Sequence, residues 1–442
     1  MVVLLSLIAA CAALSLSLSL ATPSLAHCSS RTAFVSTGIS SFGSLLSIPR
    51  RLTPSSGVAS AMTTSTTTTT AVDSDKSIQP TPRNTVIYQP LSIDIDGVRI
   101  PIAAWYPSNN ENSSDDKDSE CATAVTNDVS YEYRISVSKI GKYLAQWNLP
   151  TFLDRNFKLS PSMTNGAVVV VQSIPSNDEN CDSIQQLQLL PKSSYPMVLL
   201  AHGFLGSRFD LSHLGETLAS NGFLVLSPEY PESLSSSYDV SRSTAFTGRR
   251  DSTDRTLITN TLLTTLTTKW GIEPASYGIV GHSLGCGTVD TTGDERWTRV
   301  CIAGFPSLRG SNCLFIGSIN DGAVPALRSV ETLKQNNFVF LHEEETRLWN
   351  SDMTTLPSRA ALIFRNINTA PNHISFLAEG PNDAMVEFLA PLLPLARLVG
   401  IPLLDFDKYQ LSRDSKVTSD VVIPLIVEYM EQNMIPRLSS LS

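Results

Sequence analysis

Short apolar runs alternate with longer mixed segments through the second half of the chain. The runs have the length of buried strands, and the segments between them are long enough to form helices. Strands that alternate with helices predict a mostly parallel central sheet with crossover helices on both faces, an α/β fold. The expected strands are Met197–Leu200, Phe223–Leu226, Tyr277–Val280, Val300–Ala303, Leu314–Ile316 and Ala360–Phe364, and the clearest expected helices are Asp254–Lys269 and Val324–Lys334.

An antiparallel hairpin is predicted upstream of these runs. Asp96-Gly97 separates two strand-like segments, Leu91–Ile95 and Val98–Tyr106, and Asp-Gly between such segments is a strong signal for a two-residue turn. We expect one main domain over residues 86–436, with insertions near residues 107–165 and 337–357.

The N-terminal segment has the composition of a targeting leader. No acidic residue precedes Asp73, and arginines are the only charged side chains among many serines and threonines. Val2–Leu20 is apolar, and Ser24-Leu25-Ala26 offers a small-residue cleavage site, as in a secretory signal. The Ser/Thr-rich stretch that follows resembles a transit peptide. Residues 1–72 are therefore expected to be a cleavable signal-plus-transit leader, of the kind that directs proteins to an algal plastid acquired from another alga, and residues 73–85 a linker. Plain secretion with a disordered Ser/Thr-rich stalk is the alternative, and a membrane anchor at Val2–Leu20 is a less favoured one.

Charge and cysteine content narrow the class of protein. With 41 acidic and 32 basic residues, the net charge is −9, and no basic stripe suits a nucleic-acid partner. The sequence has no Cys-x-x-Cys and no paired histidine spacing, so neither a metal nor another cofactor is expected. Of the cysteines, Cys286, Cys301 and Cys313 lie in or beside apolar runs and are expected to be buried thiols. Cys121 and Cys181 lie in polar segments and could pair only in an oxidising compartment.

The segment Gly281-His282-Ser283-Leu284-Gly285 carries the strongest chemical signal. It follows the strand-like run Tyr277–Val280 and therefore has the form of a nucleophile elbow, a strained strand-to-helix turn that exposes a serine. Glycines on either side avoid collisions with the flanking elements. Ser283 is the candidate nucleophile, and it needs a base to take its proton and an acid to orient that base.

Two residues downstream of the elbow are the candidate base and acid. Of the six histidines, His373 follows the last expected strand in a loop that enters an apolar segment, whereas His342 heads an acidic run and has the character of a surface residue. Asp321 follows the strand Leu314–Ile316, at the end where functional loops gather in α/β sheets. A turn aspartate before glycine is the structural alternative for Asp321.

The candidate oxyanion donors are two backbone N–H groups. One is that of Leu284, directly after the nucleophile, and the other is that of Phe204, in the turn that follows the strand Met197–Leu200. Such donors stabilise the negatively charged oxygen of a tetrahedral intermediate in acyl transfer.

Residues 197–376 resemble the α/β-hydrolases grouped with platelet-activating-factor acetylhydrolase and dienelactone hydrolase, a group related to chlorophyllases. The resemblance is carried by the segments His202–Arg208, Leu218–Phe223, Gly281–Gly285 and Asn372–Phe376. It implies an α/β-hydrolase fold with Ser283, Asp321 and His373 as the triad. The chain departs from the group at Cys286, where a second glycine is frequent. Its acid also comes one strand later than in the acetylhydrolases and chlorophyllases, as in dienelactone hydrolase.

These features predict a serine carboxylic-ester hydrolase whose substrate is a small-molecule or lipid-like ester. A chlorophyllase-like pigment esterase in the plastid is the first alternative, and a non-catalytic binder with the hydrolase fold is the second. The apolar run Ala390–Leu404 is expected to be a core helix with a strand-like tail. A lid in peripheral contact with a membrane is the other interpretation of that run. The oligomeric state stays open.

Overall fold

The computed structural model describes residues 85–108, 129–161, 171–173, 195–235, 238, 244–246, 252–343, 355–398, 409 and 412–435. All of them belong to one compact unit, Asp75–Ser442. The predicted leader, residues 1–72, lies outside the described residues, as do nearly all of the predicted linker and both Cys121 and Cys181. No helix in the described part of the chain is long and apolar enough to cross a membrane.

The core of the fold is a ten-stranded sheet in the order β11-β12-β10-β9-β8-β6-β7-β2-β1-β5. Its first strands, β1 (Val86–Ile95) and β2 (Val98–Pro107), form the expected hairpin around Asp96-Gly97. β2 also pairs antiparallel with β7, and the other pairs in this sheet are parallel. The remaining strands are β5 (Val171–Ser173), β6 (Met197–Ala201), β7 (Leu224–Pro228), β8 (Tyr277–His282), β9 (Thr298–Ile302), β10 (Cys313–Ser318), β11 (Val339–Leu341) and β12 (Arg359–Phe364).

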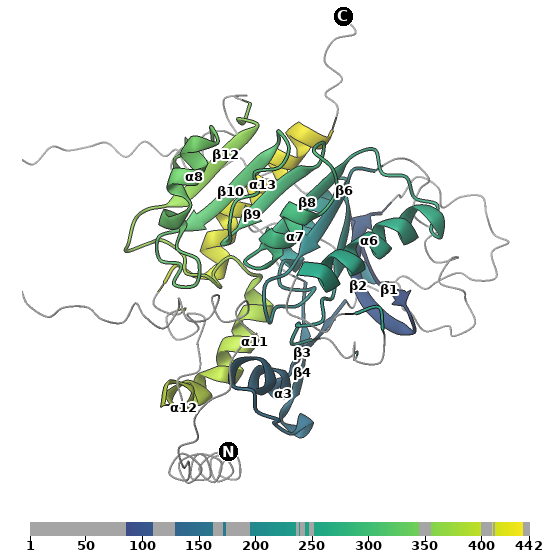
Figure 1. Ribbon diagram of the computed structural model, residues 1–442, viewed down its shortest axis with the longest axis vertical. Coiled ribbons are helices and arrows are strands. Elements are labelled where there is room, and N and C mark those ends of the chain that lie inside the picture. Colours follow the sequence, from purple (N-terminus) through teal and green to yellow (C-terminus); the bar gives the residue numbers. More distant parts are fainter. Residues whose placement is uncertain are drawn as a thin grey trace, which may run out of the picture. The chain divides into compact units, whose positions relative to one another are not determined.

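Helices cover both faces of this sheet (Figure 1). Alternate residues of the central parallel strands pack on opposite faces of the sheet, because successive side chains of a strand point to opposite faces. Val198 and Leu200 pack with α5 (Ser212–Ser220) and α13 (Ser415–Met434), while Leu199 and Ala201 pack with α6 (Ser252–Thr268), α7 (Gly285–Thr291) and α8 (Val330–Gln335). The predicted α/β architecture, a mostly parallel central sheet with crossover helices on both faces, is confirmed.

The first predicted insertion contains a small structure of its own. β3 (Tyr131–Ile135) and β4 (Arg155–Leu159) form a separate antiparallel pair. Between them lie α3 (Val137–Ile140), the π-helix η2 (Gly141–Ala145) and the 3-10 helix η3 (Thr151–Leu153). β4 contacts α11 (Glu379–Leu389), where the rings of Phe157 and Phe388 meet edge to face.

Three expectations about helices and insertions need correction. The expected helix Val324–Lys334 begins later and is divided into a 3-10 turn, η6 (Ala326–Arg328), and α8. Val324 does not start a helix because the residue before a proline is disfavoured in the helical region, and Pro325 itself has an extended ψ of 123°. The predicted insertion at 337–357 includes the edge strand β11, and its residues 344–354 lie outside the described part.

The third correction concerns the run expected to be a core helix. It forms the 3-10 helix η7 (Ala390–Leu392) and α12 (Leu393–Leu398), which continue from α11 away from the sheet (Figure 1). Leu398 is 80% exposed, so the described part of this run is not core. Residues 399–404 lie outside the described part.

The expectation that three cysteines are buried thiols is confirmed. Cys286, Cys301 and Cys313 are buried free thiols. Gly304 leaves the space that the Cys286 side chain occupies, because a Cβ on Gly304 would lie 2.4 Å from the Cys286 Sγ. The cysteine at position 286, where a second glycine was expected, is therefore accommodated by a glycine in the turn that follows β9.

Candidate active site

The elbow has the backbone conformation that the sequence predicts. Ser283 lies between the end of β8 and the start of α7, with a positive φ of 54°, which is strained for a residue with a side chain. A Cβ on Gly285 would lie 2.0 Å from the carbonyl oxygen of Ala201. Only glycine fits at this close approach of α7 to β6, so the backbone holds Ser283 at the carboxyl edge of the sheet.

His373 joins the candidate nucleophile to the candidate acid. Its Nε2 lies 3.0 Å from the Ser283 Oγ, and its Nδ1 lies 2.9 and 3.0 Å from the two carboxylate oxygens of Asp321. Asp321 is an acceptor, so Nδ1 carries the proton and Nε2 is left to accept the serine proton. The structure thus brings the three predicted residues, separated by 90 and 52 positions, into one hydrogen-bonded chain.

The turn after β10 orients the Asp321 carboxylate. Its Oδ1 accepts the backbone N–H groups of Ala323 at 2.9 Å and Val324 at 2.7 Å. Asp321 is 1% exposed, so these donors also replace water for a buried charge. Asp321 is therefore a turn aspartate and also faces His373. Its contacts with the turn fix the orientation of the carboxylate toward the His373 ring.

The loop that carries His373 is held by Asn372 and His282, two residues to which the sequence analysis assigned no role. The Asn372 side chain accepts the N–H groups of Ile374 and Ser375, at 3.1 and 3.0 Å. The His282 Nε2 lies 3.0 Å from the His373 carbonyl oxygen and donates to it. The role of Asn372 could have been expected from the local sequence, because asparagine favours turns. Nothing in the local sequence indicates that His282 contacts the His373 loop, 91 positions away.

The other histidines are placed for different tasks. His342 is exposed just after β11. Burial lowers the pKa of His213 and of His282 to about 3, and that of His202 to about 4. These three rings are therefore neutral near pH 7, and in the described contacts none of them approaches the Ser283 hydroxyl as His373 does.

The turn after β6 adjoins the candidate nucleophile. A Cβ on Gly203 would lie 3.1 Å from the Cβ of Ser283, so the backbone that leads to Phe204 passes directly beside the serine. The turn closes with a bond from the Gly206 N–H to the Gly203 carbonyl oxygen at 3.2 Å, and Leu205 has a positive φ of 58°. The two predicted oxyanion donors, on Phe204 and Leu284, thus belong to the two segments that flank Ser283.

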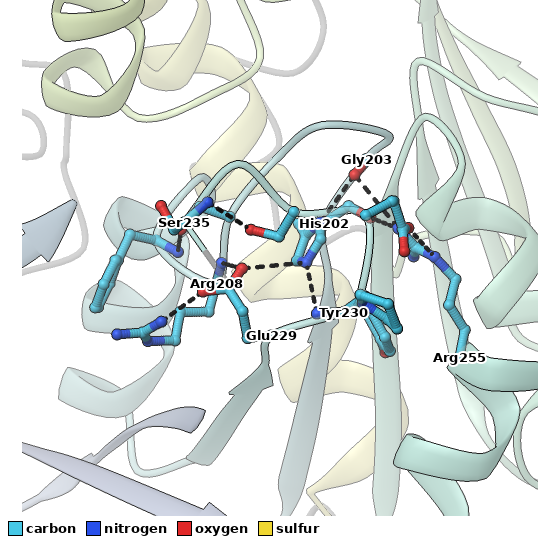
Figure 2. Close-up of polar contacts among 12 residues, drawn as sticks. His202, Gly203, Arg208, Glu229, Tyr230, Ser235 and Arg255 are labelled. Carbon is cyan, nitrogen blue, oxygen red and sulfur yellow. Dashed lines mark hydrogen bonds and ion pairs between the residues drawn. The ribbon is translucent and has the colours of Figure 1, made fainter. Parts of the chain in front are cut away.

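A buried polar cluster lies beneath this turn (Figure 2). Glu229 is fully buried and pairs with Arg208, while Arg255, 3% exposed, reaches the turn from α6. The sequence interpretation did not identify Glu229 or Arg255, because nothing in the local pattern shows which distant segment each one contacts. Within the described residues, no group of three or more His, Cys, Asp or Glu side chains could hold a metal ion.

Comparison with known proteins confirms the resemblance over part of the chain. Residues 159–261 match the family described as platelet-activating factor acetylhydrolase, isoform II. This stretch includes the turn after β6 and ends before Ser283. No curated protein matches the chain.

Solved structures that match the chain include three hydrolases. A putative dienelactone hydrolase from Klebsiella pneumoniae is 13% identical, with a TM-score of 0.33, over 70% of this chain and 98% of its own. A ferulic acid esterase from Streptomyces cinnamoneus is 14% identical, with a TM-score of 0.37, over 81% and 92%. A dienelactone hydrolase-like promiscuous phosphotriesterase from metagenomic libraries is 12% identical, with a TM-score of 0.37, over 79% and 99%.

Proposed function

We propose that this protein is a serine carboxylic-ester hydrolase that acts on an apolar or lipid-like ester. The observation that carries the proposal is the hydrogen-bonded chain from Ser283 through His373 to Asp321, built on a strained elbow. A ring nitrogen that is free to accept, 3.0 Å from a serine hydroxyl, is the arrangement that activates a weak nucleophile.

In the acylation half-reaction, the Ser283 hydroxyl gives its proton to the His373 Nε2 as its Oγ bonds to the ester carbonyl carbon. The carbonyl π electrons move to the oxygen, and the backbone N–H groups of Phe204 and Leu284 stabilise the oxyanion. When the intermediate collapses, the bond to the alcohol oxygen breaks, and that oxygen takes the proton from His373. Asp321 stabilises the imidazolium throughout and keeps its tautomer.

The deacylation half-reaction repeats these steps with water. His373 takes one proton from water as the water oxygen bonds to the acyl carbon of the acylated Ser283. The second tetrahedral intermediate then releases the carboxylic acid, and His373 returns the proton to the serine oxygen. The net change is one water consumed and one ester bond cleaved, without a redox step.

Exposed apolar side chains around Ser283 support an apolar substrate. Leu284 is 40% exposed and Phe305 is 64% exposed, and the backbone before Phe305 adjoins the elbow, because a Cβ on Gly304 would lie 2.7 Å from the Ser283 carbonyl oxygen. In the turn after β6, which also adjoins Ser283, the ring of Phe204 meets Tyr143 of the first insertion edge to face, at 6.1 Å. An acyl chain bound between these groups would remove apolar surface from water.

A chain-length series of p-nitrophenyl esters tests the proposal on the purified chain. We expect hydrolysis by the wild type, a higher kcat/KM for medium than for acetyl chains, and loss of activity in Ser283→Ala. Phospholipid and chlorophyll substrates then separate the lipid esterase from the pigment esterase. A folded wild-type protein that cleaves none of these esters would contradict the proposal and favour the non-catalytic binder.

A further inference from the structure

In the turn after β6, the carbonyl oxygen of Gly203 accepts from two side chains in addition to the Gly206 N–H that closes the turn. The Gly203 oxygen lies 2.8 Å from the His202 Nδ1 and 3.3 Å from the Arg255 Nη2, which also donates to the His202 oxygen at 2.9 Å (Figure 2). The N–H of this same peptide belongs to Phe204. The Phe204 N–H, which is proposed to stabilise the oxyanion, therefore belongs to the same peptide unit as the Gly203 carbonyl that the His202 and Arg255 side chains contact.

The hydrogen bonds of His202 determine which ring nitrogen carries its proton. The Tyr230 backbone N–H can only donate, and it lies 3.0 Å from the His202 Nε2, so Nε2 accepts. The neutral ring then has its proton on Nδ1, which donates to Gly203. Burial, together with the charge of Arg255, lowers the pKa of His202 to about 4, which keeps this tautomer neutral.

Arg255 is fixed on every side of its guanidinium. Its Nε donates to Glu232 at 2.6 Å, its Nη1 donates to the Thr288 hydroxyl at 3.2 Å, and the group lies 4.2 Å over the Tyr230 ring. Thr288 belongs to α7, the helix that follows the nucleophile. Arg255 thus connects the turn of Phe204 to the helix that begins after Leu284, the other proposed donor.

A donor to a peptide carbonyl has two effects at the N–H of the same planar unit. It fixes the direction of that N–H, because carbonyl and N–H lie in one rigid plane. It also polarises the peptide, so that the N–H becomes a stronger donor, as in cooperative hydrogen-bond chains. A cationic donor in a buried site has the larger effect.

Building on the proposed esterase activity, we propose that Arg255 and His202 are positioning residues that orient and polarise the Gly203–Phe204 peptide for the oxyanion. Neither side chain touches the substrate. Their contribution acts on the tetrahedral intermediate, where the oxygen is charged, and hardly on the bound ester, where it is neutral.

Two variants of Arg255 and one matched control test this inference in the full mature chain. Arg255→Gln removes the cation. Arg255→Lys keeps a charge that cannot reach Glu232 and both carbonyl oxygens together. The control is Arg299→Gln, because Arg299 is also fully buried and donates to three backbone carbonyl oxygens, at 2.7 to 2.9 Å, but at the amino end of β9. Active sites are counted by the end-point of fluorophosphonate labelling, and folding is followed by thermal unfolding.

We expect kcat per labelled site on a p-nitrophenyl ester to fall about 10- to 100-fold in Arg255→Gln, since a whole oxyanion donor is worth roughly 10²- to 10³-fold. Arg255→Lys should fall by less, with KM nearly unchanged in both. The affinity for an alkyl trifluoromethyl ketone, which forms a tetrahedral oxyanion on the serine, should fall by the same factor as kcat. Arg299→Gln should lose stability and keep its kcat per labelled site.

If Arg255→Gln does not fold, Arg255→Lys alone decides. Wild-type kcat and ketone affinity in the folded Arg255 variants would overturn the inference, and so would an equal loss in Arg299→Gln. An active wild type with unaffected variants removes only this inference. A wild type that neither hydrolyses esters nor labels removes the proposed function as well.

Discussion

Replacing Asp321 with asparagine should inactivate the protein without unfolding it. The Oδ1 of Asp321 accepts two backbone N–H groups, at 2.7 and 2.9 Å, and only the amide oxygen of an asparagine can take that place. The amide nitrogen must then occupy the position of Oδ2, 2.9 Å from the His373 Nδ1. The NH₂ group at that position donates, and the amide oxygen, 3.0 Å from Nδ1, already accepts two backbone N–H groups. The favoured tautomer therefore has Nδ1 as acceptor and the ring proton on Nε2, where it prevents acceptance of the serine proton.

The wrong tautomer and the lost negative charge together should lower kcat about 10³- to 10⁴-fold, or about 4 to 5 kcal/mol of transition-state stabilisation. The melting temperature should stay near that of the wild type, because both backbone donors keep their acceptor. In Asp321→Ala they do not, so that variant should also lose roughly 1–3 kcal/mol of stability.

The assay for Asp321→Asn is kcat/KM on one short ester, with thermal unfolding of each variant. Asp290→Asn is the matched control. The Asp290 carboxylate accepts a hydrogen bond from the Ser307 hydroxyl at 2.9 Å, and the amide oxygen of an asparagine can accept the same bond, so this variant should keep its activity. More than a tenth of wild-type kcat/KM in Asp321→Asn would refute the tautomer argument, as would an equal loss in Asp290→Asn.

Three further predictions concern the base, the elbow and the response to acid. His373→Ala should reduce kcat about as far as loss of the nucleophile, because triad members act as a unit, whereas His342→Ala should be near neutral; the reverse order of kcat/KM would move the base to His342. Gly285→Ala should prevent stable folding because its Cβ would lie 2.0 Å from a backbone oxygen, while Gly287→Ala, whose Cβ meets nothing within 4 Å, should raise stability by about 0.5–1 kcal/mol; equal melting temperatures would contradict the packing argument. Burial lowers the folded-state pKa of His213 to about 3, so unfolding takes up a proton at pH values below the ordinary histidine pKa of about 6.5, and stability falls as the pH decreases between these two values. Between about pH 7 and pH 4.5, the melting temperature of His213→Leu should therefore decrease less than that of the wild type. An equal decrease would show that His213 is not a source of acid lability.

The parts of the fold that the sequence predicts well are those with a local signal. β6, β8, β9, β10 and β12 are apolar runs with clear ends, and the hairpin of β1 and β2 has its Asp-Gly turn. The candidate site follows from the same signals, because Ser283, Asp321 and His373 each come shortly after such a strand. Parallel strands bring their carboxyl ends to one edge of the sheet, so three residues far apart in sequence become neighbours.

The parts that were missed depend on tertiary contacts. α13 contains Val421, Val422 and Ile423 directly before Pro424, a β-branched run and a breaker that argue against a helix. Its apolar residues are distributed around the helix because β8, β9, β10, α5 and α11 all contact it. The hydrogen bonds from Arg255 to the carbonyl oxygens of Gly203 and His202 join residues that are 52 and 53 positions apart in the sequence. No short sequence pattern encodes such contacts.

The most direct test of the account is fluorophosphonate labelling followed by mass spectrometry of the labelled peptide. In the folded wild type, we expect one label on Ser283, since its hydroxyl is the one hydrogen-bonded to His373 in the described structure. Ser283→Ala should melt near the wild-type temperature, take up no label and lose its esterase activity. Labelling of another residue, or full ester hydrolysis by folded Ser283→Ala, would contradict the assignment of Ser283 as the nucleophile.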